Sequence, residues 1–106
     1  MPAEFIFLIS RTGRVRLQKF YGPYSLLSRR EQGRIVRDVT SVMTARSRKA
    51  ANVFAYGGGK CVYRRYASLY FVVGVSDREN VLIELEKIHL LVCTLDKYFG
   101  NVCELE

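Results

Sequence analysis

The chain has no tryptophan, one histidine, two prolines and three cysteines among its 106 residues. The single histidine and the lack of a Cys-x-x-Cys pair argue against a structural zinc site, which uses paired ligand spacing. The longest apolar runs are far shorter than the roughly 20 residues that cross a bilayer, so we expect no membrane-spanning helix. The amino terminus lacks the basic region of a signal peptide, which predicts a cytosolic protein with buried, free thiols.

Apolar residues make up 49% of the chain and charged residues 25%, a composition typical of a globular protein. A chain of this length organises at most one hydrophobic core, which excludes a two-domain enzyme. We therefore expect a single domain over residues 1–106.

Charge is distributed unevenly along the chain. Residues 1–76 contain fourteen basic and three acidic residues, net +11, whereas residues 77–106 contain three basic and seven acidic residues, net −4. The basic part is expected to face nucleic acid, an anionic membrane, an acidic peptide or an acidic protein surface. A solvated positive surface that serves only solubility is the alternative.

Hydrophobic periodicity predicts an antiparallel sheet with helices in the order ββαβββα. The first strand is apolar on both faces, which indicates a central position, and it forms a hairpin with the second. The predicted strands cover residues 5–9, 15–21, 53–56, 60–66 and 69–75, and the predicted helices cover residues 25–46 and 77–98.

The second predicted helix has more than one apolar face. One face packs on the sheet, and another needs a further element or a partner chain to cover it. The apolar side chains outside its main stripe are Leu82, Leu90, Leu91 and Cys93.

Two local patterns resemble catalytic or phosphate-binding motifs. Residues 57–60 read Gly-Gly-Gly-Lys, but Cys61 follows and a strand begins, so we interpret them as a hairpin turn. His89 and Cys93 lie one helical turn apart with no third group to orient them. We therefore expect neither an enzyme nor a bound cofactor or metal.

Residues 63–66 mix arginines with tyrosines, as a platform for single-stranded nucleic acid does. Strand alternation, however, places Arg64 and Arg65 on opposite faces, so they form no single basic ribbon. We expect no nucleic-acid binding; a nucleic-acid-binding domain would show an affinity that falls steeply with salt.

Three stretches carry a resemblance to a known family: residues 13–21 (GRVRLQKFY), 63–71 (YRRYASLYF) and 95–105 (LDKYFGNVCEL). In this order and spacing they resemble the sigma (small) subunits of heterotetrameric clathrin-associated adaptor complexes. The resemblance runs from Phe5 to the end of the chain. It implies an α/β (α+β) longin-like domain, with a five-stranded antiparallel sheet in ββαβββα order and helices on its faces.

The resemblance also implies a function in vesicle-mediated protein transport. A sigma subunit assembles with a large adaptin chain and a medium (mu) subunit, and associates peripherally with coated pits, trans-Golgi or endosomal vesicles. With the large chain it binds acidic dileucine signals in cargo tails. Two leucine side chains each gain about 2 kcal/mol by leaving water, which favours a shallow apolar pocket.

Site residues are carried over by the same resemblance. Arg16 faces the acidic residue of the signal, through an attraction that weakens with salt. The apolar positions are equally consistent with core residues. The residues that match the pocket are Ala67, Leu69, Val92 and Val102, with the polar Asn101 beside them.

Family members continue into further helices, so the resemblance implies a chain that is truncated at its C-terminus. The missing part would cover the second helix, and we expect the chain alone to self-associate or to be marginally stable. The short glycine turn favours the AP-1, AP-2 or AP-4 type over AP-3. A freestanding longin-type trafficking scaffold that binds a small GTPase is the alternative function.

Overall fold

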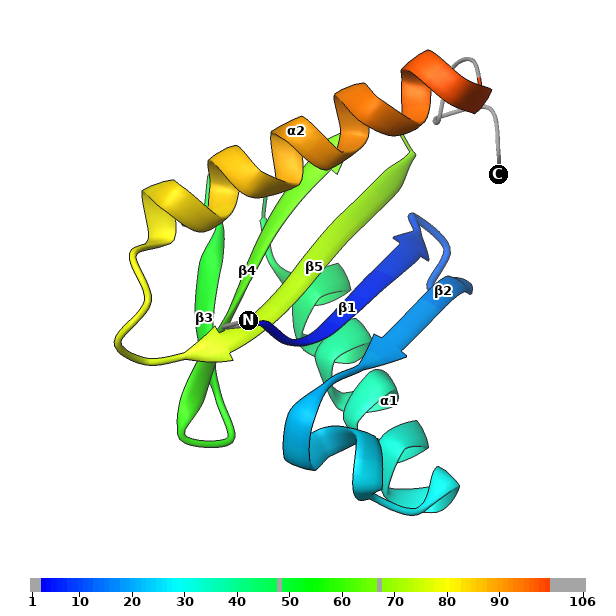
Figure 1. Ribbon diagram of the computed structural model, residues 1–106, viewed down its shortest axis with the longest axis vertical. Helices are drawn as coiled ribbons and strands as arrows, with labels where there is room; N and C mark the ends of the chain where they lie inside the picture. The colour runs from blue at the N-terminus through cyan, green and yellow to red at the C-terminus, as the bar shows by residue number, and fades with distance from the viewer. Residues whose placement is uncertain (1–2, 48, 67, 100–106) are drawn as a thin grey trace.

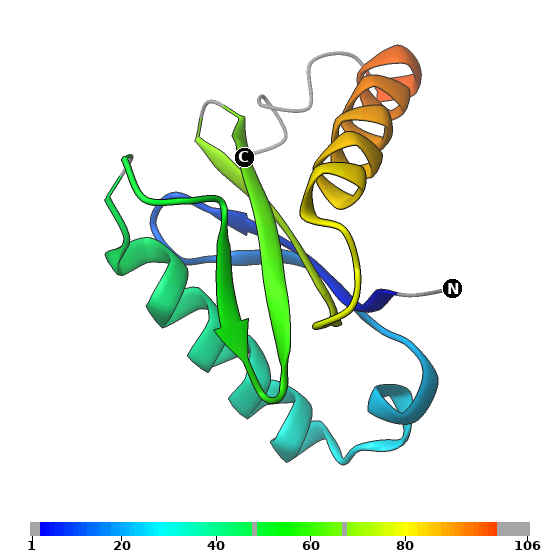
Figure 2. The ribbon, with the colours of Figure 1, turned by 90° about the vertical axis from the view of Figure 1, so that its left-hand side faces the viewer.

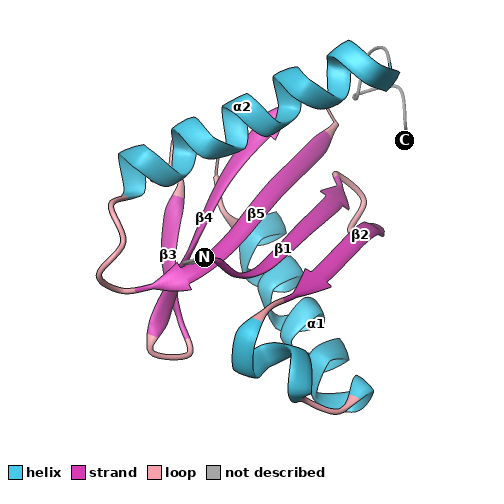
Figure 3. Cartoon of the chain, in the orientation of Figure 1, coloured by secondary structure: helices cyan, strands magenta, loops and turns pink. Residues whose placement is uncertain are grey.

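The computed structural model describes residues 3–47, 49–66 and 68–99, and its elements follow the predicted order ββαβββα. One five-stranded antiparallel sheet lies between two helices, with α1 on one face and α2 on the other (Figures 1 and 2). The predicted fold class is therefore confirmed. The strands are β1 (Ala3–Ser10), β2 (Val15–Phe20), β3 (Val53–Tyr56), β4 (Gly59–Tyr66) and β5 (Leu69–Ser76); the helices are η1 (Gly22–Leu26), α1 (Arg29–Ala45) and α2 (Val81–Phe99) (Figure 3).

The sheet has the strand order β2-β1-β5-β4-β3. β5 is therefore the central strand, and β1, which we expected there, is the inner strand beside it. β5 pairs with β1 on one side and with β4 on the other, and all its residues except Ser76 are buried. Both strands are covered on two faces, which explains why both read as continuous apolar runs.

α1 begins later than the sequence pattern predicts. A 3-10 turn, η1, follows β2, and the α-helix begins at Arg29 instead of residue 25. The Oγ atom of Ser28 accepts a hydrogen bond from the N–H of Glu31 at 3.2 Å, which satisfies a free donor of the first turn. This N-cap fixes the start of α1.

α2 also begins later than predicted, at Val81 instead of residue 77. The Oδ1 atom of Asn80 accepts hydrogen bonds from the N–H groups of Leu82 and Ile83, at 2.9 and 3.2 Å. Asp77 and Glu79, which the predicted range of 77–98 places inside the helix, therefore precede it. Lys60 donates hydrogen bonds to the carbonyl oxygens of both residues, which fastens this loop to β4.

Each face of the sheet has its own hydrophobic core. Alternate residues of β1 point to opposite faces, so Phe5 and Phe7 pack toward α1, whereas Ile6 and Leu8 pack toward α2. The α1 face is rich in aromatic residues, and the rings of Phe5 and Phe7 stack with centroids 4.6 Å apart. The ring of Phe5 packs directly on Gly74 of β5. A Cβ atom at position 74 would come within 2.2 Å of this ring, so the position requires glycine.

The glycine run forms the turn between β3 and β4, as predicted. Gly57 and Gly58 have φ angles of 56° and 84°, the left-handed region that glycine adopts without strain. Gly59 already belongs to β4. The helices in the described part of the chain are too short or too polar to span a membrane.

Candidate functional site

The structure describes three of the six residues in the predicted signal-binding set. Leu69, at the start of β5, and Val92, on α2, are buried with exposed fractions of 0% and 5%. Both belong to the core cluster between the sheet and α2. Positions Ala67, Asn101 and Val102 lie outside the described residues.

Arg16 lies on the exposed strand β2, in a β-bulge. The pairing of β1 with β2 passes from Leu8 opposite Leu17 to Ile9 opposite Val15, so Arg16 is the extra residue of the bulged strand. Bulges locally redirect side chains, and this one is next to the β1–β2 turn. The alternation of apolar and polar residues along 15–21 did not predict this bulge.

Arg16 and Leu69 lie at the same end of the sheet. The N–H of Arg11, in the β1–β2 turn, donates a hydrogen bond to the carbonyl oxygen of Ser68 at 2.7 Å, which joins this turn to the start of β5. Two strand spacings separate β2 from β5 in the sheet order, which corresponds to about 10 Å. The described part of the predicted site is therefore brought together at one end of the molecule.

An apolar hollow of about 230 Å³ lies between α2 and the β1 side of the sheet. Sequence reasoning missed it, and none of the three described site residues lines it. Glu84 lines this hollow and is only 2% exposed, and Lys87 forms an ion pair with Glu84 at 3.2 Å. The sequence feature that could have indicated the burial of Glu84 is its position one helical turn before Ile88, on the stripe that packs on the sheet.

The outer surface of α2 is apolar, as the sequence indicates. The exposed fractions are 75% for Leu82, 56% for Ile83, 58% for Leu90 and 36% for Leu91. Leu82, Ile83 and Leu90 define the outer apolar face of α2, and Leu91 lines the hollow beside the sheet. In Figure 1, α2 crosses the upper side of the sheet over β4 and β5, and no described element lies on its outer side.

The described thiols differ from the prediction that all cysteines are buried. Cys61 is fully buried, and burial raises the pKa of its thiol from 9.0 to about 12. Cys93 is exposed, so the prediction is wrong for this residue, which lies one position off the packed stripe of α2. Its Sγ atom lies 3.6 Å from Nε2 of His89, whose Nδ1 lies 3.4 Å from the hydroxyl of Tyr66. Cys103 lies outside the described residues.

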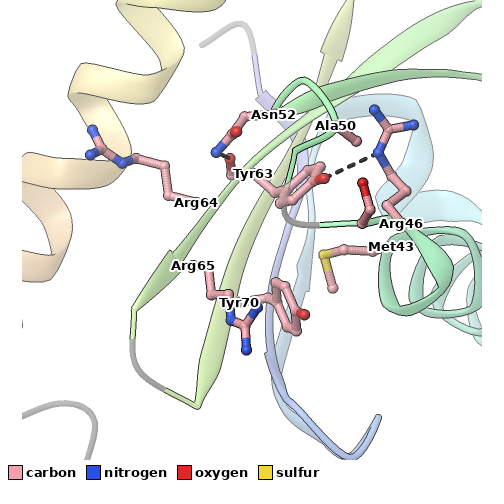
Figure 4. Close-up of a pocket in the computed structure, with 9 residues that line it drawn as sticks. Met43, Arg46, Ala50, Asn52, Tyr63, Arg64, Arg65 and Tyr70 are labelled. Carbon is pink, nitrogen blue, oxygen red and sulfur yellow. Dashed lines mark hydrogen bonds between the residues drawn. The ribbon is translucent and has the colours of Figure 1, made fainter.

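A second hollow, of about 260 Å³, lies between the end of α1 and the strands β4 and β5. Arg46 lines this hollow and donates a hydrogen bond from Nε to the hydroxyl of Tyr63 at 3.1 Å (Figure 4). Figure 4 also shows the side chains of Arg64 and Arg65 pointing in different directions. Arg65 lies over the ring of Tyr70, on the α1 face, and Arg64 lies over Tyr66, on the α2 face. The predicted separation of the two arginines is confirmed.

With this geometry in place, the similarity to known proteins decides the family. Residues 3–106 match the family model of the clathrin adaptor complex small chain. The chain belongs to this family. Clathrin adaptor small chains are structural subunits, so the chain is not an enzyme.

Two relatives illustrate the similarity. The chain is 51% identical over 106 residues to the AP-1 complex subunit sigma-1 of Schizosaccharomyces pombe. This alignment covers 100% of the present chain and 64% of the relative. It is 47% identical over 107 residues to the AP-4 complex subunit sigma of Arabidopsis thaliana. That alignment covers 100% of the present chain and 72% of the relative. The chain therefore spans less than two thirds of the length of its AP-1 relative from Schizosaccharomyces pombe.

The fold is also found in a larger assembly. The structure is similar to a chain in a homology model of the full-length AP-3 complex in a stretched open conformation. The TM-score is 0.68 at 23% identity, over 97% of this chain and 70% of the other. The longin-like fold of the clathrin adaptor small chains is thus confirmed for this chain.

Proposed function

We propose that this clathrin adaptor small chain assembles with a large adaptin chain and a medium (mu) subunit, and takes part in binding acidic dileucine signals on coated vesicles. The observation that carries the proposal is the match of residues 3–106 to the small-chain family. The proposed location is cytoplasmic, at coated pits and trans-Golgi or endosomal vesicles. Nothing in the structure favours the alternative of a freestanding scaffold for a small GTPase.

The positions of Arg16 and Leu69 support the binding of an extended peptide. The roughly 10 Å between their strands is covered by about three residues of extended chain, which suits an acidic residue that precedes a leucine pair. Arg16 is exposed on β2 and supplies the positive charge. Leu69 and Val92 are buried, and they would form the floor on which the leucine side chains pack.

The outer apolar face of α2 supports assembly with a large chain. Exposed Leu82, Ile83 and Leu90 lie on one helix, and groups of exposed apolar side chains mark interfaces between proteins. The basic first part of the chain adds a positive surface for an acidic partner.

Charge reversal at Arg16 tests the signal-binding function. In the assembled complex, Arg16→Glu should weaken binding of a peptide with an acidic residue upstream of Leu-Leu by about three- to tenfold, because it replaces attraction by repulsion. Binding is measured by fluorescence anisotropy, and a thermal melt checks the fold. Arg30→Glu, the same change at an exposed residue of α1 on the opposite face, is the control.

Two results would contradict the role of Arg16. The first is unchanged affinity of Arg16→Glu for the acidic peptide. The second is an equal loss in Arg30→Glu. Assembly is tested separately by isolating the protein from its own cells: a co-purifying large adaptin chain supports the proposal, and a small GTPase in its place supports the scaffold.

A further inference from the structure

The sheet has two edge strands, β2 and β3, and they differ in how their outer edges are satisfied. An edge strand presents unpaired backbone N–H and C=O groups to its surroundings. On the β3 side, Arg46 caps the start of this edge. Its Nη2 atom donates hydrogen bonds to the carbonyl oxygens of Ala51 and Val53, at 2.8 and 3.2 Å, and its guanidinium group lies over the ring of Phe54.

The outer edge of β2 has no such cover from the described part of the chain. The N–H of Tyr21 donates a hydrogen bond to the carbonyl oxygen of Glu4 at 2.9 Å, so this residue faces β1. Hydrogen-bonding direction alternates along an antiparallel strand, which places the N–H and C=O groups of Gln18 and Phe20 on the outer side. In Figure 1, β2 forms the right-hand border of the sheet, and no described strand lies beyond it.

The side chains of β2 indicate what pairs with this edge. Leu17 and Lys19 lie opposite Leu8 and Ile6, and therefore project on the α2 face. Leu17 is 43% exposed, and no acidic residue within the described chain lies within salt-bridge distance of Lys19. An incoming strand with an acidic residue against Lys19 and an apolar residue against Leu17 would satisfy both positions.

A second copy of the chain suits this edge poorly. Pairing β2 with β2 would bring two basic strands together, each with Arg16 and Lys19, and like charges on neighbouring strands are destabilising. The bulge at Arg16 also limits regular pairing to the stretch that begins at Leu17. Both features favour an acidic peptide over self-association.

We propose that the outer edge of β2 is a strand-addition site for an extended acidic peptide segment. The segment pairs with the backbone N–H and C=O groups of Gln18 and Phe20. It places an acidic side chain against Lys19 and an apolar side chain against Leu17. The proposal does not depend on dileucine capture, because backbone pairing on β2 requires no leucine pair in the peptide.

The experiment uses a synthetic peptide as long as β2, in which glutamate and valine occupy alternate positions of one face and threonine fills the other, so that no leucine is present. Binding to the protein is measured by isothermal titration calorimetry at low salt. Two further peptides have the same side chains but carry N-methyl groups on alternate amides, in one of the two possible phases. We expect one phase to abolish binding and the other to retain it, because only alternate amides of an added strand face β2.

Substitutions in the protein test the same contact from the other side. Gln18→Pro removes a donor on the outer side of β2, whereas Gln18→Ala retains it, and a thermal melt checks that both variants fold. We expect about a fivefold loss of affinity for Gln18→Pro and no change for Gln18→Ala. Lys19→Glu should weaken binding of the acidic peptide and favour one with lysine in place of glutamate, whereas Arg78→Glu, in the exposed loop before α2, should do neither.

Three outcomes would overturn the proposal. One is equal binding of both N-methylated peptides, which would show a contact through side chains alone. Another is no measurable binding of the unmodified peptide at low salt. The last is a peptide-independent dimer that Gln18→Pro disrupts, which would make a second copy the occupant of this edge.

Discussion

The two faces of the sheet are closed to different degrees. On the α1 face, large aromatic side chains fill the core, and α1 packs against them with buried Ile35, Val39 and Met43. The solvent side of α1 is mainly polar and basic. On the α2 face, the packed stripe of α2 is equally well buried, but the outer apolar face of α2 is exposed, and a hollow of about 230 Å³ separates α2 from the β1 side.

This difference separates stability from assembly. The α1 face is satisfied within the chain, so its residues are expected to determine the free energy of unfolding. The outer face of α2 contributes little burial to the folded monomer, so its residues are expected to determine what the protein binds. Substitutions on the two faces should therefore affect different measurements.

The largest effect is expected on the α1 face. Phe7→Ala removes a fully buried ring that contacts both Phe5 and Phe20, and should lower the free energy of unfolding by about 4 kcal/mol. The matched change on the other side, Leu82→Ala, should alter it by no more than about 0.5 kcal/mol, because this side chain is 75% exposed. Urea denaturation measures both. Similar losses in the two variants would refute the distinction between the faces.

A smaller effect on stability, but a clear one on association, is expected on the outer face of α2. The double variant Leu82→Gln with Leu90→Gln should remain monomeric at concentrations where the unaltered chain self-associates, and its stability should change by less than about 1 kcal/mol. Analytical ultracentrifugation measures the association. An unaltered chain that is monomeric at every concentration would contradict this prediction.

The smallest effect concerns one thiol from each face, Cys61 and Cys93. In a Cys103→Ser background, iodoacetamide at neutral pH should alkylate exposed Cys93 and leave Cys61 unmodified until the protein unfolds. The pKa of Cys61, raised from 9.0 to about 12, lowers its thiolate fraction about a thousandfold, and burial blocks access. Mass spectrometry of the labelled peptides decides, and equal labelling would contradict the burial of Cys61.

The same shift has a consequence at alkaline pH. Because the pKa of Cys61 is higher in the folded state, its contribution to stability is complete below about pH 9 and is lost as the pH rises toward 12. The decline of stability over this window should be smaller in Cys61→Ala. Urea denaturation at a series of pH values provides the comparison, and an identical decline in both proteins would exclude Cys61 as a cause.

Periodicity predicted the order and type of every main element, because both helices have a regular apolar stripe and the strands are short apolar runs bounded by turn residues. It misplaced the helix starts, because the caps Ser28 and Asn80 act through side-chain hydrogen bonds to one or two backbone N–H groups, which leave no periodic signal. It also assigned Cys93 to the interior from its apolar neighbours, although Val92, one position earlier, occupies the packed stripe.

The candidate site was predictable only in part. The resemblance identified Arg16, Leu69 and Val92, but the burial of the last two depends on the packing of α2 against the sheet. The bulge at Arg16 depends on the pairing of two strands, and the cover on β3 depends on a contact between Arg46 and residues five and seven positions away. Contacts of this kind follow from the tertiary fold and have no local pattern.

The guanidinium group of Arg46 also makes the two borders of the sheet unequal. It occupies the carbonyl oxygen of Val53, which an added strand would otherwise use, so a strand that approaches from outside finds this acceptor already taken at β3. If Arg46 were replaced by a side chain too short to reach Val53, this acceptor would become open to an added strand. One cationic side chain therefore biases the sheet toward extension at one border.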